Sequence, residues 1–243
     1  ILINHYAGSN RHGMEYRPYF MAKRWVQAGH QVTIVAASFS HLRGLNPDMQ
    51  GKSTMEETID GVRYFWIRCP EYKGNGMGRI RNMLTFLAGL YRYQKQITAQ
   101  GKPDAVIASS TYPLDIYPAH QIAKKNGAKL IYEVHDLWPL SPMELGGMSA
   151  KHPYIMLMQA AENYCYKHSD AVVSILPCAK EHMVEHGMAP EKFVCIPNGI
   201  VKEDWEAPID PEKAPYRELL QEFHNQGYFL IGYTGAHGIA NAL

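Results

Sequence analysis

The chain has 243 residues, of which 46% are hydrophobic and 19% charged, so it can form a sizeable core and is not a disordered protein. Its 24 basic and 23 acidic side chains nearly cancel, which excludes a global field that favours nucleic acid. The four cysteines lie far apart without a CxxC pair, which favours buried thiols in a reducing compartment over disulfides. We therefore expect a globular, cytoplasmic protein that binds no nucleic acid.

The first part of the chain has the pattern of a βαβ unit followed by a hairpin. A short apolar run over residues 1–4 leads into a glycine loop, and a helical spacing of apolar residues then ends at Gly29, where a left-handed cap is favoured. The β-branched run 31–37 predicts the second strand. Residues 38–57 show no periodicity, which is typical of a functional or mobile loop, and Asp60-Gly61 predicts a hairpin turn.

Helices and strands alternate along the middle of the chain. We predict helices over residues 77–100, 115–125, 154–167 and 179–186, and strands over 104–108, 129–134, 171–176 and 193–196. Because parallel strands need crossover connections, this alternation predicts an α/β fold with a Rossmann-like, doubly wound parallel sheet that helices cover on both faces. In such sheets ligands bind at the carboxyl ends of the strands.

The end of the chain begins to repeat its start. A charged, proline-rich stretch over residues 201–215 is typical of a linker, and a helical pattern follows near residues 217–224. An apolar strand over residues 228–233 then leads into a loop with Gly235 and Gly238. This repeats the opening order of strand, glycine loop and helix.

The repeat predicts two domains. We place the first over residues 1–207, a linker and helix over 208–227, and the first strand and glycine loop of a second domain over 228–243. Because one strand cannot bury its own faces, we expect residues 228–233 to be disordered, to pair with the edge of the first sheet, or to pair with another chain. Ile1 is not methionine, so we expect the natural start to lie upstream.

A glycine loop joins the first predicted strand to the first helix. Gly8 and Gly13 bound this loop, where exposed amides near a helix start would favour phosphate. The loop lacks the GxGxxG pattern, and no acidic residue ends the second strand, which argues against a dinucleotide site. Plain turn glycines are the alternative. Arg17 lies in the first turn of the helix, and it either points to the same site or is a solvated surface arginine.

Polar residues follow three predicted strands at the ligand edge. His135-Asp136 comes directly after a very apolar strand, where polar side chains are more often functional than structural. The alternative is a histidine with a backbone partner beside an aspartate that caps a turn. Ser110 and Thr111 follow the preceding strand and suit a hydroxylated ligand or a helix cap. Asn198-Gly199 follows the last strand, and an ordinary turn is its alternative.

One short pattern points to a metal. His182, Glu185 and His186 match the HxxEH pattern of inverted zinc peptidases, in which two histidines bind the metal and the glutamate is the base. The predicted helix stops at Gly187, directly after the second histidine, and histidine is favoured near a helix C-terminus in any case. We therefore expect no metal here.

The long predicted helix over residues 77–100 combines an apolar stripe with a basic face. The stripe comprises Ile80, Met83, Leu84, Leu87, Leu90 and Tyr91. The other face carries Arg79, Arg81, Arg92 and Lys95, with Phe86 and Tyr93. A basic, aromatic helix can lie on anionic lipid, whereas a solvated face above a core stripe is the competing interpretation. Peripheral contact with the inner face of a membrane is thus a secondary expectation.

Several motifs occur in order along nearly the whole chain, namely GHQVTIVAA, EVHDLWP, AENYCYKHSDAVVSI and FVCIPNGI. Together they resemble the N-terminal half of retaining glycosyltransferases of family 4, which have two Rossmann-like domains in the GT-B arrangement. The segments GMEYRP and ASFSHLRG resemble the bacterial branch that makes surface polysaccharides such as O-antigen and capsule, with enzymes similar to L-fucosamine transferases.

The resemblance implies that a sugar passes from a nucleotide-sugar donor to an acceptor bound mainly by the N-terminal domain. By their place in the motifs, His135 would lie beside the transferred sugar and Asp136 would orient groups in the cleft. The donor-facing residues would be Gly8, Gly13, Asn198, Gly199, Gly235 and Gly238. The acceptor candidates are Arg17, His41, Arg43, Ser110 and Thr111, a set that suits a polyprenyl-diphosphate-linked saccharide.

The resemblance implies no metal and no other cofactor, because helix termini and cationic side chains stabilise the diphosphate leaving group. The family's C-terminal Glu-x7-Glu motif would lie beyond Leu243, so we expect this chain alone to be inactive. Two other functions stay open. One is a GT-B nucleotide-sugar epimerase, which needs no acceptor, and the other is a non-catalytic module that binds a saccharide.

Overall fold

The structure, a computed structural model, describes residues 1–74, 76–206, 210 and 215–233. The chain divides into two compact units, Ile1–Pro197 and Asn198–Leu243. The division predicted after residue 207 stays a prediction, and Gly235 and Gly238 lie outside the described residues. Among the described residues, no helix has the length and apolar character needed to cross a bilayer.

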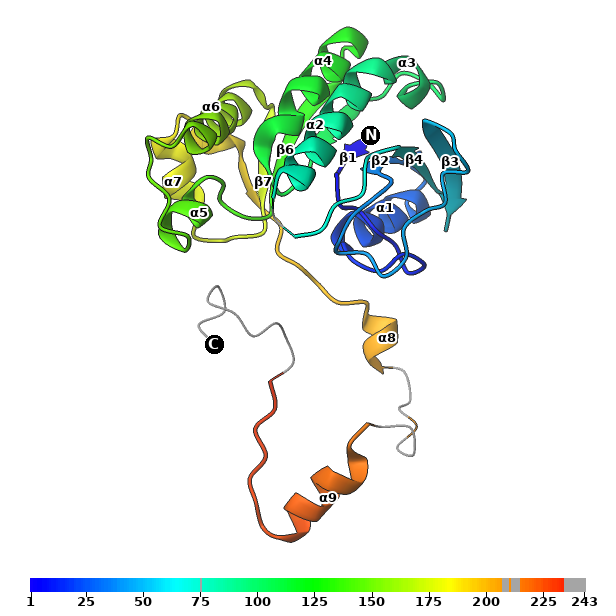
Figure 1. Cartoon of the computed structure of the whole chain (residues 1–243), viewed down its shortest axis with the longest axis vertical. Coiled ribbons are helices and arrows are strands. Elements are labelled where there is room, and N and C mark those ends of the chain that lie inside the picture. The colour runs from blue at the N-terminus through cyan, green and yellow to red at the C-terminus, as the bar shows by residue number, and fades with distance from the viewer. Residues whose placement is uncertain (75, 207–209, 211–214, 234–243) are drawn as a thin grey trace. The chain divides into compact units, whose positions relative to one another are not determined.

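The first unit is built on one eight-stranded sheet (Figure 1). The strands are β1 (Leu2–Ile3), β2 (Thr33–Ala37), β3 (Thr54–Ile59), β4 (Val62–Ile67), β5 (Ala105–Ala108), β6 (Lys129–Val134), β7 (Ala171–Ser174) and β8 (Phe193–Cys195). Their order is β3-β4-β2-β1-β5-β6-β7-β8, and only the β3–β4 hairpin is antiparallel. The predicted Rossmann-like α/β fold is confirmed.

The direction of chain progress reverses at β1. From β1 the chain moves outward to β2 and β4, and it then crosses to the other side of β1 to add β5, β6, β7 and β8. Leu2 of β1 consequently lies between Ile34 of β2 and Ile107 of β5. In open α/β sheets the crevice at such a switch point, outside the carboxyl ends of the strands, is where ligands bind. The fold therefore directs attention to the residues that follow β1 and β5.

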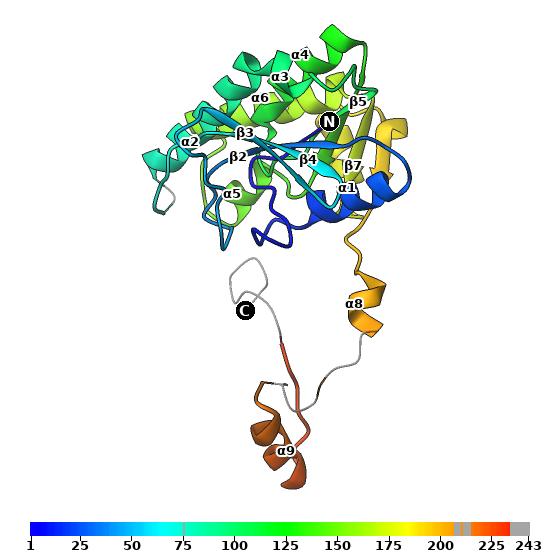
Figure 2. The same cartoon turned by 90° about the vertical axis from the view of Figure 1, so that its right-hand side faces the viewer.

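Helices cover the sheet unevenly. The first unit contains α1 (Arg17–Gln27), α2 (Met77–Arg92), α3 (Gln94–Ile97), α4 (Ile116–Asn126), α5 (Leu140–Glu144), α6 (Pro153–His168) and α7 (Lys180–Glu185), with short 3-10 turns at Pro113–Asp115 and Pro190–Lys192. The second unit contains α8 (Lys202–Glu206) and α9 (Arg217–Asn225). Figure 2 shows α2, α4 and α6 together on one side of the sheet, whereas α1 packs against β2 and β4.

Alternate residues of the central strands enter two separate cores. Ile3 and Val35 pack in the core under α2 and α4, whereas Leu2 and Ile34 pack in the core under α1. This alternation is expected where both faces of a sheet are buried. Cover is incomplete on β5 to β7, where alternate residues such as Ile107 are only half-buried. The predicted cover on both faces is therefore complete for β1, β2 and β4 only.

Several element ends agree with their sequence signals. Gly29, Gly127 and Gly187 follow α1, α4 and α7 with φ of 92°, 66° and 95°, the left-handed conformation that closes a helix. Asp60 and Gly61 have φ of 50° and 79°, as a tight hairpin turn requires. These predictions are confirmed because each depends on a local backbone preference.

The prediction for the long helix is wrong in length and partly right in face, since Met83 and Leu90 of the predicted stripe are buried. Tyr93 separates α2 from α3, so the helix ends at Arg92. Phe86, predicted on the surface, is 0% exposed, whereas Leu84, predicted in the core stripe, is 54% exposed. Gly89 explains the rotation, because a Cβ at this position would overlap the side chain of Ile67 on β4. The helix therefore packs with its glycine face against the sheet.

Residues 228–233 form no strand, and all of them are exposed. The segment belongs to the second unit, so the three outcomes expected for it, pairing with the first sheet among them, stay predictions.

Candidate functional site

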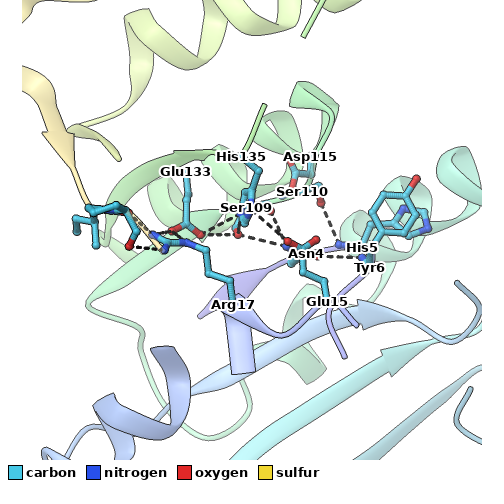
Figure 3. Close-up of polar contacts among 12 residues, drawn as sticks. Asn4, His5, Tyr6, Glu15, Arg17, Ser109, Ser110, Asp115, Glu133 and His135 are labelled. Atoms are coloured by element: carbon cyan, nitrogen blue, oxygen red, sulfur yellow. Dashed lines mark hydrogen bonds and ion pairs between the residues drawn. The ribbon is translucent and has the colours of Figure 1, made fainter. Parts of the chain in front are cut away.

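The carboxyl ends of β1 and β5 are joined by buried polar residues (Figure 3). Asn4 and His5 follow β1, and Ser109 and Ser110 follow β5. Nδ2 of Asn4 donates to the carbonyl oxygen of Ser109 at 2.6 Å, and the backbone N–H of His5 donates to Oγ of Ser110 at 3.0 Å. These bonds fix the two strand ends at the switch point of the sheet.

His5 is a neutral histidine with both ring nitrogens occupied. Nδ2 of Asn82 donates to the carbonyl oxygen of Pro70 at 2.7 Å, so Oδ1 of Asn82 accepts from Nε2 of His5 at 2.6 Å. Nδ1 of His5 then accepts from the hydroxyl of Tyr112 at 2.5 Å. Burial is the main cause that lowers the pKa of His5 to about 3. This histidine is part of the scaffold.

A second histidine, His135, lies between two carboxylates at the end of β6. Glu133 and His135 are alternate residues along the chain, so they point to the same face. Oγ of Ser109 donates to Oε2 of Glu133 at 2.7 Å and accepts from Nε2 of His135 at 2.9 Å. Nδ1 of His135 lies 3.4 Å from Oε1 of Glu15. Figure 3 shows these residues in one row with Arg17.

The two carboxylates keep His135 protonated at neutral pH. Burial lowers the pKa of His135, but the hydrogen bonds and charges of Glu133 and Glu15 outweigh burial and raise the pKa to about 9. Burial raises the pKa of Glu133, yet His135, Ser109 and Arg17 outweigh it and lower the pKa to about 2. The site thus contains an imidazolium whose two N–H groups both face oxygen atoms, and such groups donate strong hydrogen bonds.

Arg17 completes the row of charges from the start of α1. Its Nε and Nη2 lie 3.1 and 3.0 Å from Oε1 of Glu133. It also donates to the carbonyl oxygens of Ile196 and Pro197 at 2.8 and 3.2 Å. The alternative of a solvated surface arginine is wrong, because the side chain is largely buried. Glu133 already compensates the charge of Arg17, so this geometry does not favour the predicted contact with an acceptor phosphate.

Arg43 is a structural cation, and its prediction as an acceptor ligand is wrong. The guanidinium is buried and donates to the carbonyl oxygens of His5, Ala7 and Ala37 at 3.2, 2.8 and 2.8 Å. Its plane also lies over the ring of Trp66, 4.8 Å from the ring centroid. Burial lowers its pKa to about 10, which still leaves it charged at neutral pH. The guanidinium also donates to Oδ1 of Asn46 at 3.3 Å, so its hydrogen bonds go to groups of the protein itself.

His41 belongs to a separate group of side chains, which we call the Tyr6 patch and which comprises Tyr6, His41, Tyr72 and Arg79. Nε and Nη2 of Arg79 donate to the hydroxyl of Tyr6 at 3.3 and 3.2 Å. Nδ1 of His41 lies 2.6 Å from the hydroxyl of Tyr72, and its ring contacts that of Tyr6 edge-on. Burial and the charge of Arg79 lower the pKa of His41, so the patch holds one cation.

The loop over residues 8–13 is closed on itself. The amide of Gly8 donates to the carbonyl of Glu15 at 2.9 Å, and the amides of His12 and Gly13 donate to the carbonyl of Ser9 at 3.1 and 2.8 Å. A Cβ on Gly8 would overlap the carbonyl oxygen of Gly13, which itself has φ of 87°. The loop geometry therefore requires both glycines, as the turn alternative expected, and their donor-facing role stays a prediction. The prediction of exposed amides for a phosphate is wrong for these three amides.

The remaining predicted residues are scattered. Asp136 is exposed, and its Oδ1 accepts from the amide of Leu137 at 2.9 Å and from the hydroxyl of Ser141 at 2.6 Å, so it caps the turn before α5. Ser110 is buried as the acceptor of the His5 amide, and Thr111 is half-buried. Asn198 and Gly199 begin the second unit and are exposed.

The family of glycosyl transferase 4-like domains matches residues 12–199. This chain belongs to that family. Among solved structures, sucrose-phosphate synthase from Thermosynechococcus elongatus aligns over 93% of this chain and 96% of its own, with 12% identity and a TM-score of 0.51. HepE from Anabaena, solved in complex with UDP and glucose, aligns over 90% of this chain with 12% identity and a TM-score of 0.50.

Because their sequence identity to this chain is low, the two solved structures show only that this glycosyltransferase domain shares their fold. The chain spans 49% of the length of HepE. A comparison with curated protein sequences found no match. The family assignment therefore rests on the match over residues 12–199, and the fold on both findings.

Two residues that determine the charge of His135 in this glycosyltransferase domain were missed in the sequence. Glu133 carries a detectable signal, because a carboxylate in an apolar strand, on the same face as His135, is costly unless it is paired. The approach of Glu15 depends on the path of the loop after β1 and has no such signal. Asn4 and His5 could have been found by the rule that selected His135, since they directly follow a buried strand.

Proposed function

We propose that this glycosyltransferase 4-like domain is the acceptor side of a retaining glycosyltransferase that moves a sugar from a nucleotide-sugar donor to a lipid-linked or saccharide acceptor. The observation that supports the proposal best is the imidazolium of His135 beside the switch point of the sheet. A charged donor at this edge can hold a sugar hydroxyl while the bond to the diphosphate breaks.

The Nδ1 side of His135 is the side that would meet the sugar. Glu15 is 21% exposed whereas Glu133 is 7% and His135 6% exposed, so the more accessible side of this group is the one on which Glu15 lies. The 3.4 Å separation of Nδ1 and Glu15 is longer than an ordinary N–H···O hydrogen bond. A sugar hydroxyl inserted here would accept from the imidazolium and donate to the carboxylate.

The donor is expected to be a nucleotide sugar because HepE carries UDP and glucose in its structure. We propose UDP-glucose as the first donor to test, and we propose that residues outside this chain hold most of the nucleotide. Residues 1–243 alone are therefore expected to give no transfer. No metal or other cofactor takes part in the transfer step on this proposal, so a chelator should leave the transfer rate of the complete protein unchanged.

The Tyr6 patch is the proposed contact for the acceptor. It presents the exposed imidazole of His41, which suits a sugar hydroxyl, and the cation of Arg79, which suits a phosphate, whereas Tyr6 and Tyr72 are buried and hold these two side chains. A saccharide linked to a polyprenyl diphosphate presents both chemistries, as in the synthesis of bacterial surface polysaccharides such as O-antigen and capsule. His41 keeps its predicted role here, whereas Arg79 replaces Arg43 as the candidate for the acceptor phosphate.

A lipid-linked acceptor would bring the protein to the inner face of the membrane. The exposed face of α2 supports such a contact, because apolar and basic side chains alternate along it at helical spacing. This face comprises Met77, Arg81, Leu84, Tyr91 and Arg92. Phe86 does not belong to it, since the structure buries that ring.

The test is a transfer assay with the complete protein, UDP-glucose and a panel of other nucleotide sugars, and a polyprenyl-diphosphate-linked saccharide. We expect a product that keeps the anomeric configuration of the donor and that forms only when the acceptor is present. Conversion of the nucleotide sugar without an acceptor would instead support an epimerase. Binding of the saccharide without turnover of any donor would support a non-catalytic module.

A further inference from the structure

Two histidines and one carboxylate meet between α6 and α7, outside the polar network described above. His182 lies on α7 and His186 directly follows it, whereas Glu162 lies on α6. Nε2 of His182 is 3.4 Å from Oε1 of Glu162, and the ring centroids of the two histidines are 4.4 Å apart. One nitrogen or oxygen atom from each of the three residues lies within 4.8 Å of the others.

These separations suit a small transition-metal cation. Zinc binds imidazole nitrogen and carboxylate oxygen at about 2.0–2.2 Å, so two tetrahedral ligand atoms lie about 3.3–3.5 Å apart. The pair His182 and Glu162 already has this separation, at 3.4 Å. Two histidines and one glutamate form a zinc ligand set that leaves one position for water. The 18% exposure of His182 gives solvent access to that position.

The surroundings of Glu162 resemble those of a supported metal ligand. The carboxylate is buried, and it accepts from the hydroxyl of Tyr166 at 2.9 Å and from Nε2 of Gln159 at 2.7 Å. Nε2 of Gln159 also lies 3.1 Å from Nδ1 of His186, and a metal ion bound to His186 would replace this contact, because the amide nitrogen can only donate. Metal-binding carboxylates are commonly oriented by hydrogen bonds of the kind that Tyr166 and Gln159 donate to Glu162. The carboxylate is therefore held in place by neighbours on α6.

The arrangement differs from that of the zinc peptidases that the HxxEH pattern suggests. Glu185, which would be the base of a peptidase, is exposed on the last residue of α7. The expectation of no metal considered α7 alone, and it could not include the third group, which comes from α6. The dipole of α7 accounts for histidines at its C-terminus, but it does not account for a buried carboxylate that faces them.

We infer that Glu162, His182 and His186 bind one divalent transition-metal cation of the zinc class, which fixes α7 against α6. The site joins the helix after β7 to the helix before it, so bound metal stabilises the folded state without taking part in sugar transfer. A ligand that binds only the folded protein, at free concentration c, stabilises it by RT ln(1 + c/Kd), so the unfolding temperature rises with the metal concentration.

The test uses cobalt and zinc as probes. The protein carries Cys178→Ser and Cys195→Ser, because these changes remove its two exposed thiols, which could also bind the metal. We expect one Co²⁺ per chain, the intense visible absorption of low-symmetry coordination, its displacement by Zn²⁺, and a higher unfolding temperature with zinc. His182→Ala, His186→Ala and Glu162→Gln should each weaken binding at least about tenfold, the range seen for loss of a supporting or direct ligand.

The matched control is the pair His120 and His168, whose rings on α4 and α6 are 5.2 Å apart. Their replacement by alanine should leave the affinity and the absorption unchanged. Circular dichroism of each variant without metal separates loss of a ligand from loss of the fold, and the half-exposed His186 is the variant least expected to unfold. The inference is wrong if the folded protein binds no cobalt, or if His186→Ala binds it as tightly as the parent.

Discussion

The carboxylate of Glu15 lies 3.4 Å from Nδ1 of His135, and this contact joins the segment before α1 to the end of β6. With Glu133 on the other side of the ring, it keeps a positive charge at the carboxyl edge of the sheet. The charge belongs to the site as a whole, since carboxylates from two separate segments determine it.

The first prediction concerns Glu15. Glu15→Gln removes one of the two negative charges beside His135, so the pKa of His135 should fall from about 9 toward its ordinary value. A pH titration followed by the NMR signal of the imidazole measures the change. Asp136→Asn is the control, because Asp136 faces Ser141 and should leave the titration of His135 unaltered. An unchanged titration in Glu15→Gln would show that Glu15 does not influence the histidine.

The second prediction concerns stability at alkaline pH. The pKa of His135 is about 9 in the folded protein and 6.5 as the ordinary value, so protonation favours folding. This contribution, about 3 kcal/mol from the shift at 1.36 kcal/mol per pKa unit, is complete below pH 6.5 and is lost as the pH rises through 9. Urea unfolding across this window should show the loss in the parent protein and a smaller loss in His135→Gln.

Glu133 contributes with the opposite sign. Its pKa is about 2 in the folded protein against 4.5 ordinarily, so its contribution is complete above pH 4.5 and is lost as the pH falls toward 2. The two shifts together predict a plateau of stability between pH 4.5 and 6.5 from these groups. The test compares the free energy of unfolding of the parent with that of His135→Gln at each pH. If this difference rose between pH 6.5 and 9 instead of falling, the charge assigned to His135 would be wrong.

The third prediction concerns the ion pair of Arg17 and Glu133. Arg17→Ala leaves a buried carboxylate without its guanidinium, and removal of one partner of a buried pair costs about 3–5 kcal/mol. The double variant Arg17→Met with Glu133→Gln should be more stable than Arg17→Ala, because no buried carboxylate is left without its guanidinium. Urea unfolding of the three proteins measures both effects. A loss below about 1 kcal/mol in Arg17→Ala would be typical of a surface pair and would contradict the burial of this one.

The fourth prediction concerns the glycine loop. Gly8→Ala forces a Cβ into the carbonyl of Gly13, so the loop must shift, at a cost of about 1–3 kcal/mol. Gly199→Ala is the matched control, because a Cβ there meets nothing within 4 Å and the change should be within about 0.5 kcal/mol. Thermal unfolding of the two variants measures the difference. Equal effects would mean that Gly8 is not required by the packing of the loop.

Much of the fold was accessible from the sequence because it depends on local chemistry. The hairpin at Asp60-Gly61 and the helix ends before Gly29, Gly127 and Gly187 all follow from residues that tolerate positive φ. The face of α2 was accessible only in part, because apolar residues such as Leu84 also lie on its exposed side. Its orientation depends on the close approach that Gly89 permits at Ile67, which is a tertiary contact.

The site was also predicted only in part, because the sequence shows local properties and does not show tertiary contacts. His135 was found because it directly follows a buried strand, which is a property of the sequence. The role of Arg43 was not predicted, because its three carbonyl partners come from segments that only the folded chain brings together. A sequence does not distinguish an arginine that binds a ligand from one that binds the backbone. That distinction moved the proposed acceptor contact from Arg43 to Arg79.

The central claim is that His135 holds the transferred sugar, and its most direct test is the transfer rate of the complete protein with His135→Ala. Loss of one preorganised hydrogen-bond donor to a reacting group typically lowers kcat by a factor of about 100–1,000. We expect a loss of this size in His135→Ala, whereas His120→Ala on α4 should keep the parent rate. Circular dichroism establishes that both variants fold. Unchanged turnover in folded His135→Ala would contradict the account.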